Sequence, residues 1–219
     1  MLLDEGSLRR LEMSVPASIQ ALLAARLDQL DAPERIVGER ASVEGMVFHR
    51  GAVLELCGGA LHEALDPQLG SLLRRELILP DRGIFADDEA FRFRHLLIRE
   101  AAYQAMPKQL RAQLHERFAD WLERTAGDRI QEHEEILAYH LERAYQYRAE
   151  LAPPRTHEQE LARRATQRLA AAARRATARI DLTAAANLLG RATTLATRDE
   201  PIYPQLLWGA RRDAEPAGR

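Results

Sequence analysis

The stretch FRFRHLLIREAAY, residues 91–103, changes its hydrophobic period in the middle. Phe91 and Phe93 alternate with arginines, which is the spacing of a half-buried β-strand. From His95 onward the apolar residues no longer alternate, and their spacing suits one face of a helix. The sequence therefore predicts a strand that runs directly into a helix, with His95 at the junction.

Several short helices are expected before this strand, because N-cap residues and first-turn prolines recur where apolar periodic segments begin. A further short helix is expected near residues 51–57, where the pair Gly58-Gly59 ends it. The start signals are Ser14 with Pro16, Asp31 with Pro33 and Glu34, and Asp66 as N-cap with Pro67.

A hairpin is predicted after the last of these helices. The runs LILP and FRFR flank a polar loop, DRGIFADDEA, and are expected to be two strands joined by it. Three short helices followed by a hairpin are the element order of a winged helix-turn-helix. We expect a winged-helix-like domain over residues 15–106, preceded by an N-terminal extension at 1–14. The spacing alone also allows a plain helical bundle.

A winged helix often binds DNA, so we compare this function with the charge that the sequence carries. The helix before the hairpin would present Arg74 and Arg75, and the wing would present Arg82. However, residues 1–106 carry 12 Arg and Lys against 17 Asp and Glu, and phosphate contacts supply most non-specific affinity for DNA. The charge favours a winged helix that packs against protein, with DNA binding as the alternative. The same surfaces hold Gln68, Ser71 and Arg92, and the acids Asp81, Asp87, Asp88 and Glu89.

From Pro107 the helices become longer. The last two, near 157–179 and 181–196, form an expected antiparallel pair, with Asp181 as the cap of the second. Small residues recur where these helices would touch, as in tetratricopeptide-like arrays, although only about one and a half units are present. We expect a tetratricopeptide-like domain over 107–197 and a flexible tail over 198–219. The small residues are Ala165, Ala172, Ala176, Ala185 and Ala192.

The sequence contains no catalytic motif. It has no G-x-x-x-x-G-K-[ST] loop and no G-x-G-x-x-G after a strand. His133 and His140 are two helical turns apart, about 10 Å, which is too far to share a metal ion, so they are interpreted as surface or partly packed residues. Cys57 has no CxxC partner and is expected to be a buried, inert thiol. We expect no enzyme and no metal site. His95 remains open between a partly buried junction residue, hydrogen-bonded to backbone, and part of a site.

The composition is that of an ordinary globular chain, with 46% hydrophobic and 29% charged residues. The single cysteine fits a reducing cytoplasm. No apolar run approaches the roughly 18 residues of a membrane-spanning helix. The expected location is therefore the cytoplasm, without a membrane segment.

Several blocks of the sequence together resemble one family. They are VPASIQALLAARLDQLDAPER, ASVEGMVFHRGAV, QLGSLLRRELILP, FRFRHLLIREAAYQAMPKQLRAQLHERFADWLE and AYHLERAYQY. They are similar to the middle of bacterial STAND-type regulators. These are signalling ATPases of the AAA+ type, many of which carry an adenylate/guanylate cyclase domain or a LuxR-type or SARP-type DNA-binding domain.

The resemblance implies a winged-helix segment and a tetratricopeptide superhelix that follow a nucleotide-binding domain. This chain would then be a non-catalytic coupling segment with no cofactor of its own, while ATP or ADP binds to the parent protein. The implied partners are that nucleotide-binding domain, and a protein or small molecule on the helical array. The phosphate-loop and Walker-B segments lie upstream in such proteins, so the chain is expected to be a fragment or a short derivative.

The resemblance also implies a role for His95. RHLLIREAA is similar to the Met-His-Asp-like motif of the STAND class, which places His95 on the motif's histidine and Arg99 on the following helix. In that class the histidine contacts the β-phosphate of ADP and helps to hold the closed, inactive state. The implied nucleotide-sensing residues are His95, Arg94 and Arg99. Two residues depart from the family: Leu96 replaces the motif's Asp, and Ile180 stands where Gly is more frequent.

Overall fold

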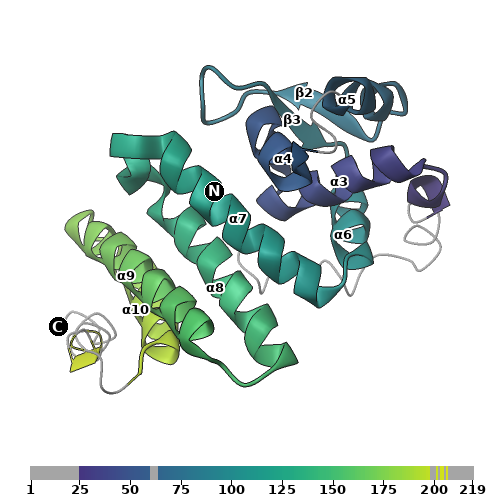
Figure 1. Ribbon diagram of the computed structural model, residues 1–219. Coiled ribbons are helices and arrows are strands. Elements are labelled where there is room, and N and C mark those ends of the chain that lie inside the picture. The colour runs from purple at the N-terminus through teal and green to yellow at the C-terminus, as the bar shows by residue number, and fades with distance from the viewer. Residues whose placement is uncertain (1–24, 60–63, 198–200, 202, 205, 207–219) are drawn as a thin grey trace. The chain divides into compact units, whose positions relative to one another are not determined.

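The structure is a computed structural model that describes residues 25–59, 64–197, 201, 203, 204 and 206. It is mainly helical, with 75% helix and one small antiparallel sheet, as the sequence predicted. The chain divides into two compact units, Met1–Met106 and Pro107–Arg219 (Figure 1). The predicted extension at 1–14, the helix start at Ser14 and most of the predicted tail at 198–219 lie outside the described residues.

The first unit combines short helices with a three-stranded sheet. The predicted hairpin is confirmed, because β2 and β3 pair antiparallel across the loop. The prediction of two strands was incomplete, since a third strand, β1, pairs with the other edge of β3. With only three residues, β1 is too short for any alternation to be recognised. The elements are α3 (Ala32–Glu44), β1 (Val47–His49), α4 (Arg50–Cys57), α5 (Leu65–Arg74), β2 (Ile78–Asp81), β3 (Ala90–Phe93) and α6 (Leu96–Ala105).

The sheet buries aromatic side chains on one face. Phe91 and Phe93 share that face because they are two residues apart on β3. Phe48 on β1 lies opposite Phe91, and its ring centroid is 5.8 Å from that of Phe91 and 5.2 Å from that of Phe93. Arg92, between the two, is exposed. Buried side chains from the helices complete the core, among them Val37, Leu69 and Ile98.

The capping-box prediction for α3 is confirmed. The Asp31 carboxylate accepts the Glu34 N–H at 2.8 Å, and the Glu34 carboxylate accepts the Asp31 N–H at 3.0 Å. The prediction of Asp66 as an N-cap was wrong, because α5 begins two residues earlier than predicted, with Ala64 at the cap position. The Asp66 carboxylate instead accepts two hydrogen bonds from the Arg50 guanidinium, at 2.6 and 2.9 Å.

Glu34 also joins α3 to α5 through a buried carboxylate. The side chain is 4% exposed and accepts hydrogen bonds from the Ser71 hydroxyl and, at 3.1 Å, from the Arg75 Nε. Burial raises the pKa of Glu34, but the hydrogen bonds from Ser71, the Asp31 backbone and Arg75 outweigh it, so the net shift is downward. The carboxylate is therefore stabilised in its charged form.

The second unit consists of long helices packed side by side. Each helix contacts the next along the chain, and neighbours run antiparallel (Figure 1). Residues Gly127–His133 form a 3₁₀ segment between α7 and α8, which begins at Glu134. Asp181 caps the last helix as predicted, by accepting the Ala184 N–H at 3.0 Å. The helices are α7 (Lys108–Ala126), α8 (Glu134–Leu151), α9 (Thr156–Ala178) and α10 (Leu182–Leu195).

Ion pairs connect helices that are not consecutive. On α7 and α9, Glu116 pairs with His157, Asp120 with Arg164, and Glu123 with Arg168. The partners follow the same order along both helices, so α7 and α9 are parallel. On α8 and α10, the nearly buried Glu142 pairs with Arg191. The second helical hairpin thus packs against the first through α8 and α9, and long side chains bridge α7 to α9 and α8 to α10.

The predicted surface or partly packed state of His133 and His140 was wrong. His140 is 1% exposed and its Nδ1 lies 2.9 Å from the Nδ1 of His115, which is fully buried on α7. His133 is also buried. The predicted burial of Cys57 was only partly right, because its side chain is half-buried. The His115–His140 pair depends on contact between two helices, which no local motif reveals.

Candidate functional site

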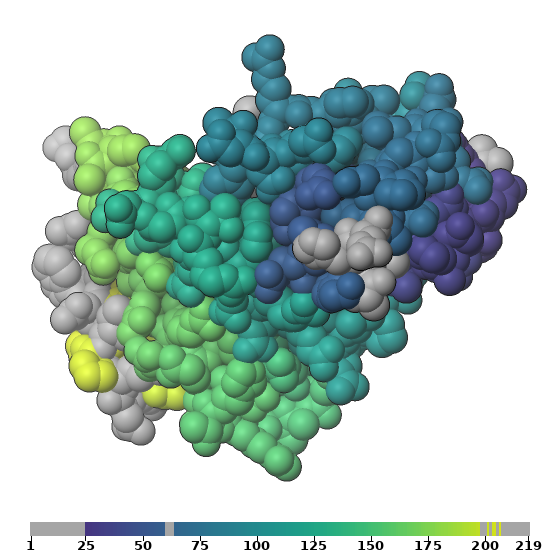
Figure 2. Space-filling view, turned by 45° about the horizontal axis from the view of Figure 1, so that its top comes forward, coloured from purple at the N-terminus to yellow at the C-terminus, as the bar shows by residue number. Residues whose placement is uncertain are grey.

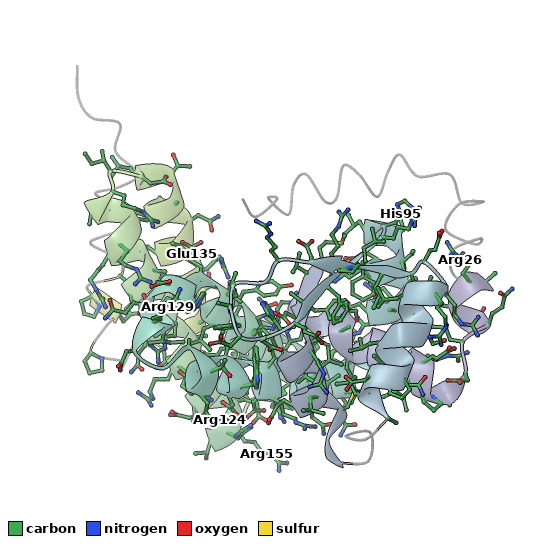
Figure 3. All side chains as sticks on the ribbon, turned by 90° about the horizontal axis from the view of Figure 1, so that it is seen from above. Arg26, His95, Arg124, Arg129, Glu135 and Arg155 are labelled. Atoms are coloured by element: carbon green, nitrogen blue, oxygen red, sulfur yellow. The ribbon has the colours of Figure 1, made fainter. Side chains whose placement is uncertain are left out.

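His95 occupies the junction between β3 and α6 and is the N-cap residue of α6. Its backbone is extended, with φ −139° and ψ 143°, and its carbonyl accepts the Ile98 N–H at 3.0 Å. The imidazole is exposed, and it forms no hydrogen bond or ion pair with any described residue. Figure 3 shows His95 at the edge of the first unit. The interpretation of His95 as a partly buried residue bound to backbone does not fit this geometry, because the side chain is free to bind another molecule.

The N-terminus of α6 is electrostatically suited to an anion. The first turn consists of Leu96, Leu97 and Ile98, so it contains no acidic side chain. The first N–H groups of a helix and the positive end of its dipole favour negative charge. Because this turn contains no carboxylate, none of its side chains would repel an anion at the helix end.

Arg94 is next to His95 but is held by weak contacts. Its backbone N–H donates to the Leu77 carbonyl at 3.0 Å, and its guanidinium lies 3.2 Å from the Glu76 carboxylate. Both side chains of this ion pair are exposed, and such pairs contribute little to stability. Arg94 can therefore exchange Glu76 for another anion at low cost.

Arg99 has a structural role. Its Nε donates to the Ser42 carbonyl at 2.9 Å near the end of α3, and the guanidinium stacks 4.8 Å from the ring centroid of Tyr103. It also pairs with Glu100, and its side chain is only 14% exposed. A cation near a helix C-terminus is favourable, so Arg99 joins α6 to α3. Of the three implied residues, His95 is available, Arg94 is loosely held and Arg99 is committed to the fold.

The residues of the DNA-binding alternative do not form one free surface. Arg75 and Ser71 on α5 both donate to the buried Glu34 carboxylate. Arg74 and Arg82 are exposed, and the Arg82 N–H donates to the Asp81 carboxylate at 2.7 Å. Of the side chains expected to face DNA on this helix, those of Ser71 and Arg75 are thus bound to Glu34 on α3.

The loop between β2 and β3 lies on the surface of the first unit, where it can be followed by colour in Figure 2. Its acids have different partners. Asp88 accepts the Gly51 N–H with both carboxylate oxygens, at 3.0 and 3.1 Å, and Asp81 lies 3.6 Å from the Arg92 guanidinium. Asp87 and Glu89 are exposed. The loop therefore still offers negative charge to its surroundings.

Two kinds of site are not found in the described part of the chain. No group of three or more His, Cys, Asp or Glu residues there is arranged to hold a metal ion. Among the same residues, no helix has the length and apolarity needed to cross a membrane.

Comparisons with protein-family models, with curated proteins and with solved structures found no match to this chain. The resemblance to STAND-type regulators therefore depends on the sequence blocks alone.

Proposed function

We propose that this chain is a non-catalytic coupling segment of a STAND-type signalling ATPase or transcriptional regulator in the cytoplasm. Its first unit would be a winged helix that relays the nucleotide state of an adjoining nucleotide-binding domain through His95. Its second unit would be a tetratricopeptide-like array that binds a protein or small-molecule ligand. The chain itself would hold no cofactor and catalyse no reaction.

The topology of the first unit supports the winged-helix proposal. A helix, a strand, two helices and a two-stranded hairpin follow one another, and the last strand lies between the other two. The first strand thus closes the sheet against the hairpin, and the loop from 82 to 89 is in the position of a wing. A plain helical bundle has no counterpart of this sheet.

The parallel alignment of α7 with α9 supports the tetratricopeptide-like proposal. Helical hairpins in such arrays stack so that each helix lies beside its equivalent in the next repeat. The ion pairs Glu116–His157 and Glu123–Arg168 give this alignment for the first helices, and Glu142–Arg191 gives it for the second helices.

The observation that carries the proposed relay is the free imidazole of His95 at the start of α6. A histidine whose side chain served only the fold would be expected to form a capping hydrogen bond or to pack in the core. Here the side chain forms no capping bond and is exposed, at a helix end that favours anions. The site is therefore suited to contact a phosphate that another domain presents.

This proposal predicts a weak phosphate site on the chain alone. Pyrophosphate is added to the ¹⁵N-labelled 219-residue chain, and amide and imidazole resonances are followed by NMR. The amides of Leu96 and Leu97 and the His95 ring are expected to shift, and His95→Ala is expected to abolish the change. His157, whose side chain is 53% exposed, is the matched control and its resonances should not move. Equal shifts at both histidines, or none at His95, would contradict the proposal.

DNA binding through α5 is the alternative function. It predicts binding that weakens steeply with salt and with replacement of Arg74 and Arg82. The use of Ser71 and Arg75 by Glu34, and the acids of the wing, count against it. A mobility-shift assay at low salt distinguishes the two functions. DNA binding by the wild-type chain that is lost in Arg74→Ala would favour the DNA-binding function over the nucleotide relay.

A further inference from the structure

His49 is buried at the end of β1 and has a partner on each ring nitrogen. The side chain is 3% exposed, and its Nδ1 lies 2.5 Å from a carboxylate oxygen of Glu44, the last residue of α3. Its Nε2 accepts the backbone N–H of Ile84, in the loop between β2 and β3, at 3.0 Å. A nitrogen that accepts a hydrogen bond carries no proton, so the proton is on Nδ1 and the imidazole is neutral.

The loop is fitted closely around this ring. A Cβ atom at Gly83 would overlap the His49 Nε2, so only glycine allows the backbone to pass there. Phe85 lies edge-on to the imidazole, with ring centroids 5.1 Å apart. Three consecutive loop residues, Gly83, Ile84 and Phe85, therefore depend on the position and the protonation state of His49.

The end of the loop nearest β3 is held in a different way. The Asp88 carboxylate accepts the Gly51 N–H, and the Glu89 carbonyl accepts the Arg50 N–H at 2.8 Å. Both bonds are made to the first turn of α4, and neither uses an imidazole. Of these hydrogen bonds, the one from the Ile84 N–H is made to a histidine ring nitrogen and therefore depends on its protonation.

The charged groups around His49 are mostly acidic. Burial raises the pKa of Glu44, the hydrogen bonds from His49 oppose this effect, and the charge of Asp88 raises it further. Arg50 is the nearby cation, and its guanidinium is paired with Asp66 at 2.6 Å. The surroundings therefore place a carboxylate on Nδ1, while Arg82, the cation of the loop itself, is exposed to solvent.

We propose that His49 is a proton-operated latch, in which protonation of Nε2 releases the tip of the β2–β3 loop, residues 82–86, while Asp88 and Glu89 keep its far end on α4. Nε2 is the ring nitrogen that can take up an added proton, because Nδ1 already carries one and donates it to the Glu44 carboxylate. The new Nε2–H then faces the Ile84 N–H, and two donors cannot bond to each other.

The release changes the surface that the first unit presents. Ile84 is 45% exposed in the latched form and is flanked by the charged residues of the loop. Once free, the tip can leave the outer side of the sheet while the β2–β3 ladder remains. Any partner that binds this loop would then bind in a pH-dependent manner. This device is independent of the proposed phosphate site at His95.

The latch is tested by NMR on the ¹⁵N-labelled full chain. Between about pH 8 and about pH 5, the hydrogen-exchange protection factor of the Ile84 amide should fall about tenfold or more, with the same midpoint as the His49 ring. The Gly51 amide, which is bound to Asp88, should stay protected throughout. At the higher pH the His49 ring should show a proton on Nδ1 only. A proton on Nε2 there, or protection of Ile84 that is constant with pH, would overturn the proposal.

A variant separates the imidazole from other effects of acid. In His49→Gln the side-chain carbonyl can reach the position of Nε2 and accept the Ile84 N–H, but it does not titrate. Ile84 should then stay protected down to about pH 5. His157→Gln, in the second unit, is the matched control and should keep the wild-type profile. The same loss of protection in His49→Gln as in the wild type would contradict the latch. If His49→Gln does not fold, the tautomer of the wild-type ring remains decisive.

Discussion

The Nδ1 atoms of His115 and His140 lie 2.9 Å apart in the interior of the second unit, where both side chains are almost completely buried. One Nδ1 must donate a proton and the other must accept it, so this contact requires a single proton between the two Nδ1 atoms. The rings of Phe118 and Tyr139 lie against His140, with centroids 4.2 and 5.2 Å away. The pair is therefore a buried polar part of the α7–α8 interface.

Replacement of one member of the pair is expected to destabilise the second unit. In His140→Ala the buried Nδ1 of His115 loses its partner on α8, and the loss of a hydrogen bond by a buried polar group costs about 1–3 kcal/mol.

Urea unfolding followed by tryptophan fluorescence measures this effect, because Trp121 is buried on α7 beside Phe118. His157→Ala, at an exposed position, is the control and should change the stability by less than about 1 kcal/mol. Equal stability of the wild type, His140→Ala and His157→Ala would contradict the role of the pair.

Glu34→Gln is expected to destabilise the first unit by about 1–3 kcal/mol, because Ser71 and Arg75 lose a charged acceptor in a buried position. Hydrogen exchange of the α3 and α5 amides measures the change. Asp66→Asn provides the matched control. It removes a carboxylate that is 65% exposed, so its effect should stay below about 1 kcal/mol. Similar losses in both variants would argue against a special role of the buried carboxylate.

The lowered pKa of Glu34 also predicts how the stability of the first unit changes at acidic pH. Its folded-state pKa lies below the ordinary value of 4.5, because its hydrogen bonds outweigh burial. The stability that it contributes is fully present above about pH 4.5 and is lost as the pH falls through the folded-state pKa. Glu34→Gln should therefore flatten the decline of stability below that pH. A decline as steep as that of the wild type would show that other carboxylates cause it.

Ile180→Gly is expected to stabilise the second unit by about 1 kcal/mol, which is measurable as a higher melting temperature. Ile180 has φ 64°, in the left-handed region that disfavours a β-branched residue, and it is 82% exposed, so its side chain contributes little packing. Ile180→Ala removes the side chain but retains a Cβ, and should recover only part of the gain. A melting temperature that falls in Ile180→Gly would contradict the assignment of strain.

Arg191→Gln is expected to cost about 2–4 kcal/mol, because it leaves the nearly buried Glu142 carboxylate on α8 without its cation from α10. Tryptophan fluorescence in urea reports the change. Arg163→Gln breaks the exposed pair with Glu160 within α9 and should change the stability by less than about 0.5 kcal/mol. Equal effects of the two variants would show that the ion pair between α8 and α10 contributes no more to stability than the pair within α9.

Local signals in the sequence predicted much of the fold. The capping box at Asp31, the cap at Asp181 and the period change at Phe93 each depend on a few adjacent residues, and all three are present in the structure. The strand β1 was missed because three residues show no period. Asp66 was misassigned because its carboxylate serves Arg50, sixteen residues earlier.

The candidate site was predictable only in part. The change of period placed His95 at a junction, but its exposure depends on how β3 and α6 meet. The sequence could not show that Arg99 binds Ser42, or that Glu34 binds Ser71 and Arg75, because these partners are 37 to 57 residues apart. No sequence pattern indicated a role for His49, because its partners come from the end of α3 and from the β2–β3 loop.

The most direct test of the proposed coupling is the rate of ADP release from a protein in which a STAND-type nucleotide-binding domain is joined to the N-terminus of this chain. A hydrogen bond to a charged phosphate contributes about 1.5–3 kcal/mol, so His95→Ala should accelerate ADP release about tenfold or more. His157→Ala should leave it unchanged. Identical ADP release from the wild type and from His95→Ala would contradict the central claim that His95 reads the bound nucleotide.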